Sequence, residues 1–430
     1  MSKKVLIITY YWPPAGGIAV VRWVKFVKYI RANNWEPIVY TVSNGNYPLT
    51  DTSLEKDVPE GIEIIKRPIW EPHQLYRLLA KNKNASGLAD IKPKDRASFV
   101  EKISNWVRSN FFIPDARAFW ISPSVRFLKK YLTANPVDAI VSTGPPHSAH
   151  LIALELKKQT RLPWLADFRD PWTTMDYYKE LLLTNWADKK HHRLELEVLK
   201  TADSVTVIGN GMKAEFEKKS ERRVEVTTNG FDEEDFSVSS MQLDQKFSIV
   251  HIGTFFSRVN PANLWEVLLE LKKENHPIIS DLQIKLIGRV DPAIVESIRM
   301  AGLEDFLILS PIQQHDEALR QMRSAQVLLL CIFEPNKFIV TGKLFEYLAS
   351  QRPIFCIGPV DGDASVILKE TNAGLAFSFS DKISIKQHLL DLYKKFKTGE
   401  LSNIKNNAEK YSHQQLVKQI VTQLDRITKQ

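Results

Sequence analysis

The chain has 430 residues, which is enough for two ordinary domains with complete hydrophobic cores. Its composition, 44% hydrophobic and 25% charged, is typical of a soluble globular protein, and no apolar run reaches the roughly 20 residues that span a bilayer. Two cysteines exclude a disulfide framework and favour a reducing compartment, and the net charge of +8 is unevenly placed along the chain.

Short β-rich runs alternate with helical patterns, which predicts parallel sheets built from βαβ units. Seven strands are expected in the first half, at 5–10, 37–42, 61–65, 138–142, 163–166, 204–208 and 223–227. Six more are expected after an acidic linker at 231–240, at 247–252, 283–287, 306–309, 325–332, 354–357 and 375–377. The N-terminal apolar run is therefore expected to be a strand, not a signal peptide.

The predicted fold class is α/β, with two Rossmann-like, doubly wound parallel-sheet domains facing a cleft. The N-terminal domain should span 1–235 and the C-terminal domain 245–410, with a helical tail at 411–430 packing back on the N-terminal domain. Ligands in such folds bind at the carboxyl ends of the strands, so the loops that follow the strands are where functional residues are sought.

The first predicted strand runs into a Pro-Pro-Ala-Gly-Gly turn that ends in Gly16 and Gly17, and a helix at 18–31 follows. Glycines at a strand-to-helix turn let a ligand approach the backbone closely, although a purely structural turn is equally compatible. The Gly-x-Gly-x-x-Gly spacing of dinucleotide enzymes is missing, and the second strand ends without an acidic residue to hold a ribose. A dehydrogenase is thereby disfavoured.

Positive charge concentrates in residues 76–130, which hold 12 Lys/Arg and 4 Asp/Glu interleaved with large aromatic residues. Such a segment suits an anionic membrane surface, and an ordinary solvated helical insertion is the alternative. Nucleic acid is not expected, because no recognition motif accompanies the charge. The helix at 18–31 carries a further basic row, Arg22, Lys25 and Lys28, interpreted as a solvated face or as a membrane contact. The expected location is cytoplasmic, with peripheral attachment to the inner face of the cell membrane as an option.

Two loops leave the carboxyl ends of the fourth and fifth predicted strands, so their polar residues should converge. His147 is the candidate acid/base group, and Asp170 is the candidate for orienting a sugar or acceptor hydroxyl. Asp167 and Arg169 are candidates for the acceptor or sugar side, with a structural ion pair between them as the alternative. The histidine pair at 191–192 lies in a charged helix without matching ligands, so surface positions and no metal site are expected.

The second half holds the residues expected to bind a nucleotide. Arg258 follows that half's first strand and can meet a diphosphate through its planar fork, an ordinary surface arginine being the alternative. Thr341, Gly342 and Lys343 open a helix, and backbone N–H groups at a helix N-terminus beside a lysine suit a phosphate. Glu346, on the same helix, can accept from the two hydroxyls of a ribose. Together these residues predict a site for a nucleoside diphosphate, one that carries a sugar.

The order of these segments resembles the glycosyltransferases with two Rossmann-like domains, the GT-B fold, and within them the large retaining family 4. The resemblance covers nearly the whole chain. It rests on the turn at 13–17, on Thr228-Asn-Gly-Phe-Asp232, on Gly253-Thr-Phe-Phe-Ser-Arg258 and, most specifically, on Thr341-Gly-Lys-Leu-Phe-Glu-Tyr-Leu-Ala-Ser-Gln-Arg-Pro-Ile354. It implies that the C-terminal domain binds the nucleotide sugar, that the N-terminal domain binds the acceptor, and that no metal or other cofactor is needed.

The resemblance also implies roles for single residues. Glu346 matches the second glutamate of the family's Glu-x7-Glu motif, which holds the ribose. Arg258 and Lys343 match positions near the diphosphate. Gly16 and Gly17 match the glycine turn that approaches the donor phosphate and the acceptor.

Two positions depart from the family pattern. The first glutamate of Glu-x7-Glu is replaced by Phe338, so the contacts that this carboxylate usually makes to the transferred sugar do not carry over from the resemblance. The usual His-Asp pair after the fifth strand is Arg169-Asp170, and His147 in the neighbouring loop is the candidate substitute for the histidine.

The sequence therefore predicts a hexosyltransferase-like enzyme, retaining by resemblance, that uses a nucleotide-sugar donor. The expected acceptor is a membrane-associated glycan or lipid-linked saccharide, as in cell-surface polysaccharide or lipopolysaccharide biosynthesis. The alternatives are a nucleotide-sugar 2-epimerase of the same fold and a nucleotide-sugar-binding protein without catalysis.

Overall fold

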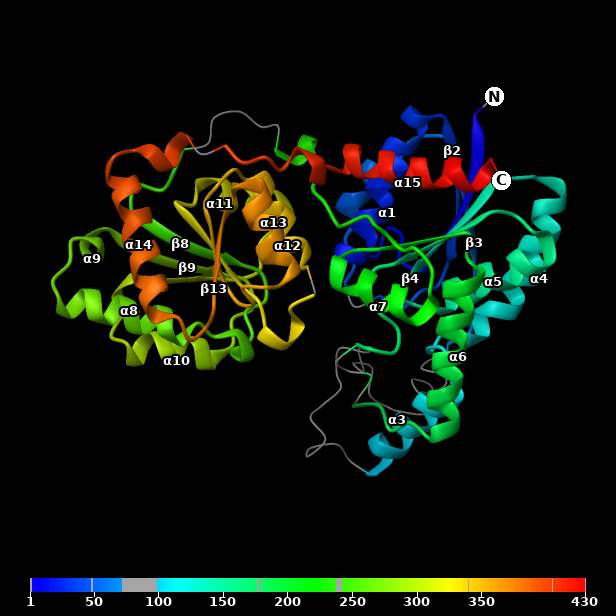
Figure 1. Cartoon of the computed structure of the whole chain (residues 1–430), viewed down its shortest axis with the longest axis horizontal. Coiled ribbons are helices and arrows are strands. Elements are labelled where there is room, and N and C mark those ends of the chain that lie inside the picture. The colour runs from blue at the N-terminus through cyan, green and yellow to red at the C-terminus, as the bar shows by residue number, and fades with distance from the viewer. Residues whose placement is uncertain are drawn as a thin grey trace. The chain divides into compact units, whose positions relative to one another are not determined.

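The structure is a computed structural model that describes residues 2–47, 49–71, 99–175, 178, 180–236, 242–338, 340–403 and 405–429. The chain divides into two compact units (Figure 1). Unit 1 comprises Met1–Thr228 and His413–Gln430, and unit 2 comprises Asn229–Ser412. No helix in the described ranges is long and apolar enough to cross a membrane.

Unit 1 is built on a sheet of seven parallel strands in the order β3-β2-β1-β4-β5-β6-β7. The strands are β1 (Lys3–Ile8), β2 (Trp35–Val42), β3 (Glu63–Arg67), β4 (Ala139–Gly144), β5 (Trp164–Phe168), β6 (Ser204–Val207) and β7 (Glu225–Val226). The central strands are apolar on both faces, as in sheets covered by helices on both sides. Strand order reverses between β1 and β4, which makes the carboxyl ends of these two strands the switch point where such folds bind ligands.

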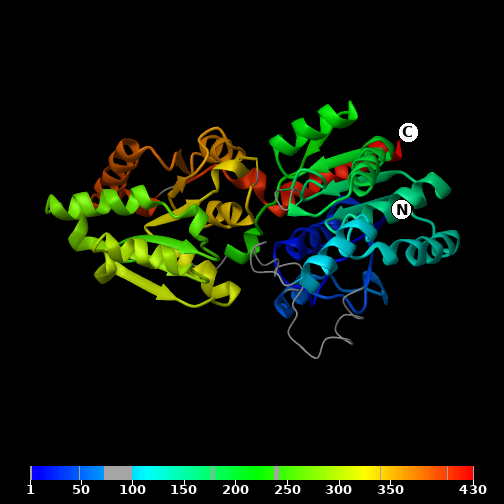
Figure 2. The ribbon, with the colours of Figure 1, turned by 90° about the horizontal axis from the view of Figure 1, so that it is seen from below.

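Helices cover both faces of this sheet. They are α1 (Ile18–Ile30), α3 (Phe99–Phe111), α4 (Ala118–Ala134), α5 (Ser148–Thr160), α6 (Asn185–Thr201), α7 (Asn210–Ser220) and α15 (His413–Thr428). Val5 and Ile7 of β1 pack with α1 and α15 on one face, whereas Leu6 and Ile8 pack with α4 to α7 on the other. The C-terminal α15 runs alongside α1, and α4 lies beside α5 (Figures 1 and 2). The chain therefore returns to unit 1 to complete one of its two cores.

Unit 2 repeats the design with six parallel strands in the order β10-β9-β8-β11-β12-β13. They are β8 (Phe247–Ile252), β9 (Leu282–Ile287), β10 (Leu307–Ser310), β11 (Val327–Cys331), β12 (Ile354–Ile357) and β13 (Gly374–Phe377). Here the order reverses between β8 and β11, so their carboxyl ends form the switch point of unit 2.

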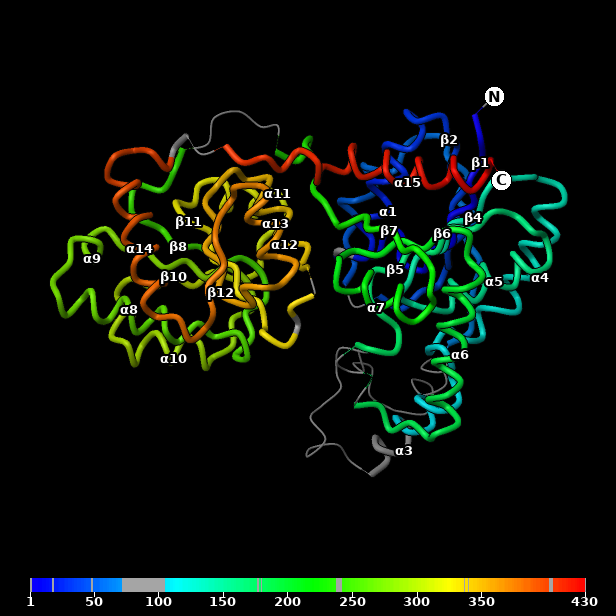
Figure 3. Tube along the Cα trace, viewed as in Figure 1, coloured from blue at the N-terminus to red at the C-terminus, as the bar shows by residue number. Residues whose placement is uncertain are grey.

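The helices of unit 2 also divide between two faces (Figure 3). They are α8 (Ala262–Lys273), α9 (Ile278–Asp281), α10 (Pro292–Met300), α11 (His315–Ser324), α12 (Gly342–Ala349), α13 (Asp363–Thr371) and α14 (Lys382–Lys397). One core joins α8, α10 and α14 to the sheet, and the other joins α11, α12 and α13. The predicted fold class of two Rossmann-like parallel-sheet domains is confirmed, and each of the thirteen predicted strands is present within a few residues of its expected bounds.

The structure describes two basic regions that the sequence analysis singled out, the row on α1 in full and the segment at 76–130 in part. The basic row of α1 was expected to face solvent or a membrane, and this is wrong: Arg22 and Lys25 are buried, and both Lys25 and Lys28 pair with Asp57, at 2.9 Å and 3.0 Å. The spacing of the basic residues on α1 could not predict this pairing, because the carboxylate of Asp57 comes from a separate segment of the chain. In the basic aromatic segment, residues 76–98 lie outside the described residues, and the described remainder includes α3 and most of α4.

Candidate functional site

The nucleotide-binding residues predicted in the second half of the chain lie at the switch point of unit 2, whereas Gly16 and Gly17 lie just before α1 in unit 1. The loop after β8 carries Arg258, and the loop after β11 leads through Thr341 into α12, which begins at Gly342. These two strands are neighbours in the sheet, so both loops emerge at the same edge. The fold thus brings the loops of Arg258 and Thr341, which are more than eighty positions apart in the sequence, to one edge of the sheet.

Lys343 is the central cation of this edge. Its ammonium donates to Nε2 of His251 at 3.0 Å, and no carboxylate within the described residues forms a salt bridge with it. His251 is itself buried, and its Nδ1 lies 3.0 Å from the carbonyl oxygen of Leu329. A carbonyl can only accept and an ammonium can only donate, so Nδ1 carries the proton and the ring is neutral. Burial, followed by the Lys343 charge, holds the pKa of His251 well below its usual value, in keeping with this tautomer.

The environment of Lys343 leaves its charge poorly compensated. Burial lowers the pKa of Lys343 to about 8, although the nearby Cys331 and Glu346 oppose that shift. Removing an ammonium from water without a counter-ion is costly, so proteins normally pair such groups. A bound anion would supply the missing partner.

Two glycines, Gly253 and Gly288, allow the loop after β8 to lie close to the side chain of Lys343. Gly253 has φ +104, and a Cβ there would lie 3.2 Å from Cε of Lys343. Gly288 has φ +122, and a Cβ there would lie 2.5 Å from the carbonyl oxygen of Gly253. Side chains at either position would therefore be strained and would crowd the loop against the lysine. At the start of α12, Thr341 adopts an extended N-cap conformation without a side-chain cap, so the first N–H groups of the helix are not capped by that side chain.

Arg258 adds a second cation. It is exposed, its guanidinium lies over the rings of Phe256 at 5.2 Å and Phe333 at 5.3 Å, and no carboxylate in the described ranges pairs with it. Stacking on two rings restricts the side chain while leaving its donors free. Phe338, on the loop that leads to α12, is 49% exposed and lies under Nζ of Lys337 at 5.1 Å.

Glu346 lies near a histidine that the sequence analysis did not single out. Burial raises the pKa of the half-buried Glu346 carboxyl. The charges of His315 and Lys343 lower this pKa, and the charge of Asp235 raises it further. His315 begins α11, and its Nε2 lies 4.0 Å from Oδ2 of Asp235. The neighbouring Asp235 carboxylate, and then the charge of Glu346, raise the pKa of His315. The cluster places one imidazole among two carboxylates at the predicted ribose position.

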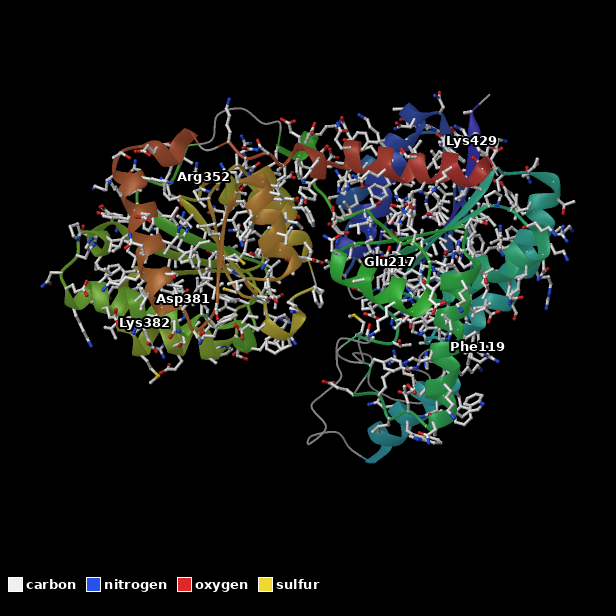
Figure 4. The ribbon with its side chains drawn as sticks, in the orientation of Figure 1. Phe119, Glu217, Arg352, Asp381, Lys382 and Lys429 are labelled. Carbon is white, nitrogen blue, oxygen red and sulfur yellow. The ribbon has the colours of Figure 1, made fainter. Side chains whose placement is uncertain are left out.

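The C-terminal end of α12 is fixed by the Gln-Arg-Pro sequence that follows it. Gln351 has φ 57, which ends the helix in the left-handed region. The buried Arg352, labelled in Figure 4, donates to the carbonyl oxygens of Ala325 and Leu401 at 2.6 Å and 2.7 Å. These bonds tie the segment that follows α12 to the residue that precedes β11 by two positions and to the turn at Glu400–Asn403.

In unit 1, Asp167 is a structural residue. Its carboxylate is fully buried and pairs with Arg22 of α1 at 2.9 Å, while Trp23 and Thr143 donate to it at 2.7 Å and 2.9 Å. The alternative of an ion pair between Asp167 and Arg169 is therefore wrong, because the pairing cation comes from α1. A fully buried carboxylate that already binds these three side chains is not accessible to an acceptor sugar.

Arg169 is also buried, and it joins the loops at the switch point of unit 1. Its guanidinium donates to the carbonyl oxygen of Ala19 at 2.8 Å and to that of Pro145. Its backbone N–H donates to the carbonyl oxygen of Gly144 at 2.9 Å. One arginine thus holds together the loops that follow β1, β4 and β5. At the start of α1, Gly17 has φ +89 and open space where a Cβ would project, whereas a Cβ on Gly16 would meet Asp51 at 2.8 Å.

Asp170 and His147 differ in their fitness for proton transfer. Asp170 is half-buried, accepts no hydrogen bond from any described residue, and has a pKa raised by burial despite the adjacent Arg169. His147 is 5% exposed, stacks on Trp172 at 4.8 Å with an interplanar angle of 2°, and has no hydrogen-bond partner on either ring nitrogen. Burial, then His150, Arg169 and His191, hold the pKa of His147 well below 6.5, so the ring is neutral and a weak base.

The expectation that His191 lies on the surface is wrong. Its Nδ1 accepts from the indole N–H of Trp172 at 3.0 Å inside the core. Glu195, one turn later on α6, accepts from the backbone N–H groups of Trp172 and Thr173, both at 3.2 Å. α6 therefore anchors the segment that follows Asp170. Trp172, an aromatic residue shortly after the fifth strand, was the only feature of the sequence that could have suggested its contacts with His191 and Glu195.

Comparison with solved structures finds the same fold along the whole chain. A glycosyltransferase from Rickettsia africae ESF-5 is similar with a TM-score of 0.63 and 13% identity, over 100% of this chain and 99% of that chain. The lipopolysaccharide outer core galactosyltransferase WaaB, in its apo form, is similar with a TM-score of 0.55 and 12% identity, over 98% and 99%. The UDP-GlcNAc 2-epimerase from Neisseria meningitidis bound to UDP-GlcNAc is similar with a TM-score of 0.53 and 14% identity, over 98% and 100%.

No protein-family model and no curated protein matches the sequence. At these identities the likeness shows the fold, which is GT-B, and leaves the activity to be argued from the residues of the site.

Proposed function

We propose that the chain is a glycosyltransferase that moves a sugar from a nucleoside diphosphate sugar to an acceptor hydroxyl. Lys343 is the observation that carries the proposal: a half-buried ammonium, without a salt bridge to any carboxylate among the described residues, at the N-terminus of α12, where the Thr341 side chain provides no cap. A diphosphate fits this environment, because its oxygens accept from an ammonium and from helix N–H groups together. Arg258, stacked but unpaired, offers a second charge.

The remaining donor contacts follow along α12. Glu346 lies one turn into the helix, where its carboxylate would accept from the ribose hydroxyls. The charges of Lys343 and Arg258 and the helix N-terminus would stabilise the diphosphate as it leaves, which would allow transfer without a bound metal ion. The nucleotide-sugar complex of the similarly folded epimerase supports this class of ligand for the fold.

Proton transfer is assigned to Asp170 in preference to His147. Its raised pKa and free oxygens make it the better base for an acceptor hydroxyl, whereas a buried neutral imidazole with a lowered pKa is poorly suited. Arg169 is assigned as a positioning residue, because it orders the loop that carries Asp170.

We also propose a membrane-associated acceptor, such as a lipid-linked saccharide. Exposed aromatic residues form two pairs near α3 and α4, Trp106 with Phe111 and Trp70 with Phe119. Phe119 is labelled in Figure 4. Exposed basic residues follow on α4, among them Lys130. Such a surface suits the headgroup region of an anionic membrane. Liposome co-sedimentation should require anionic lipid and weaken at high salt, and binding that ignored lipid charge would contradict this part.

A nucleotide-sugar 2-epimerase is the second candidate. It is supported by Phe338, which departs from the glycosyltransferase motif, and by the fold shared with the Neisseria meningitidis enzyme. Conversion of a donor in the absence of any acceptor would favour the epimerase. Tight donor binding with no conversion or transfer would indicate a binding protein.

The test is to incubate the full chain with a panel of nucleotide sugars, with and without soluble and lipid-linked glycan acceptors, and to quantify released nucleoside diphosphate. Acceptor-dependent release from at least one donor is expected, and the configuration of the product, expected to be retained, is read by NMR. Glu346→Ala should weaken donor binding at least about tenfold, because it removes charge-assisted hydrogen bonds. Glu296→Ala, on the exposed face of α10, is the matched control and should bind normally. Failure of every donor to bind would sink the proposal.

A further inference from the structure

Apolar side chains occupy the loops that follow three strands at the proposed phosphate-binding edge of unit 2, and along the chain they lie before Lys343 or after α12, whereas Glu346 lies within α12. Phe256 follows β8, Phe333 and Phe338 follow β11, and Val360 follows β12. These three strands are consecutive in the sheet, so their loops emerge side by side. Phe256 is 51% exposed, and Phe338 and Val360 are each 49% exposed. We call these four residues the aromatic rim.

The aromatic rim is joined to the phosphate-binding groups by direct contacts. Arg258 lies over both Phe256 and Phe333, so these rings flank a proposed diphosphate ligand. Phe338 precedes the N-terminus of α12 by a few residues on the same loop. The carbonyl oxygen of its neighbour Lys337 accepts from the N–H of Asp363 at 3.0 Å, which holds this loop against the turn that contains Val360. A group attached to the far phosphate would therefore meet the rim.

Carboxylates that could recognise sugar hydroxyls are already engaged on these loops. Asp361 pairs with Lys337 at 2.9 Å, and Glu334 accepts from the hydroxyl of Ser378 at 3.2 Å. Asp363 is buried at the start of α13. Of these carboxylates, the two exposed ones each have a partner and the third is buried, and position 338 itself presents a phenyl ring and no carboxylate.

We infer that the glycosyl group of the donor carries apolar substituents, deoxy positions or an N-acyl group, that pack against the aromatic rim. This inference rests on the proposed function, because it takes the diphosphate to lie at Lys343. A free hydroxyl turned onto a phenyl ring loses its water without gaining a partner, which weakens binding by about tenfold. A methyl group in the same place is removed from water and strengthens binding by about fourfold.

The experiment measures the affinity of the full chain for nucleoside diphosphates and for matched donors by titration calorimetry. For each nucleoside diphosphate that binds, three donors are compared: the hexosyl form, its 6-deoxy counterpart and its 2-acetamido counterpart. At least one modified donor should bind about tenfold more tightly than the hexosyl donor. The two modified donors separate a deoxy sugar from an N-acylated sugar.

Two variants test whether the rim causes the preference. Phe338→Glu restores a carboxylate at the rim and should reduce the preference at least about threefold, whereas the control Phe338→Leu, which stays apolar, should keep it. Affinity for the nucleoside diphosphate should change less than about twofold in Phe338→Leu. The new carboxylate of Phe338→Glu repels the diphosphate of every donor alike, so the preference is taken as the ratio of donor affinities within each variant, and thermal unfolding shows that both variants are folded.

Two results would overturn the inference. If nucleoside diphosphates bind but the hexosyl donor binds as tightly as both modified donors, the inference fails and the proposed function stands. The same holds if Phe338→Glu leaves the preference unchanged. If no nucleoside diphosphate binds at all, the proposed function fails, and the inference that depends on it fails as well.

Discussion

Replacing Lys343 with methionine should weaken nucleotide binding and stabilise the free protein at the same time. The shift of its pKa from 10.5 to about 8 corresponds to about 3 kcal/mol of penalty for the charged form in the folded state. Methionine has a similar length and no charge, so the variant removes this penalty. It also leaves Nε2 of His251 without its donor, at a cost of about 1 kcal/mol.

The balance predicts a gain of about 2 kcal/mol in the stability of unit 2, or a rise of about 4–8 °C in its unfolding temperature. The lysine is charged in both states below pH 8, so the gain should be largest there. Between pH 8 and 10.5 the unfolded lysine retains its proton while the folded one loses it, so wild-type stability rises and the gain shrinks. Calorimetry of the full chain at pH 7 and pH 10 measures both values.

The same substitution should weaken binding of a nucleoside diphosphate by about 10- to 100-fold, because a charge-assisted hydrogen bond contributes about 1.5–3 kcal/mol. Wild-type affinity should fall above pH 8, since an anion binds the protonated lysine better. Lys386→Met on α14, whose ammonium pairs with Glu274 at the surface, is the control and should change neither property. A Lys343→Met variant that is less stable than wild type and binds nucleotide normally would refute the reasoning.

Three further outcomes follow from the buried and strand-end groups. Asp167→Asn should cost about 3–5 kcal/mol of stability, because it leaves the buried Arg22 without its counter-charge; unchanged thermal unfolding would contradict the pairing. Asp170→Asn should lower turnover at least about 100-fold while donor affinity, measured by titration, stays the same; a parallel loss of both would argue against a role in proton transfer. Protonated His315 interacts with Asp235, so its contribution to stability should be present below about pH 6.5 and be lost as pH rises through its raised pKa; His315→Gln should flatten that dependence in thermal unfolding, and an unchanged profile would exclude it.

Strand ends and helix starts were predictable because they depend on local sequence. Apolar runs located every strand, and the Thr341-Gly-Lys sequence located the start of α12 at the sheet edge where we propose that the diphosphate binds, since topology brings the ends of parallel strands together. The identity of the partners was not predictable in the same way. Lys343 is matched to His251, 92 positions earlier, and the only signal was a polar residue near the end of an otherwise apolar strand.

Long-range pairing also explains the errors about charge. Arg22 and Lys25 were assigned to a solvated face from their spacing on a helix, but Asp167 and Asp57 approach them from other elements. Helical spacing reports which side chains share a face, and it cannot report which face a distant carboxylate covers. Buried histidines are a related case, because the histidine pair in α6 was judged from its charged neighbours and not from Trp172, which donates to His191.

The most direct test of the account is a crystal structure of the full chain with a bound nucleoside diphosphate. The account predicts the diphosphate at the N-terminus of α12, with an oxygen within hydrogen-bond distance of Nζ of Lys343, and the ribose hydroxyls at the carboxylate of Glu346. A nucleotide bound elsewhere, with Lys343 still hydrogen-bonded to His251 alone, would contradict it.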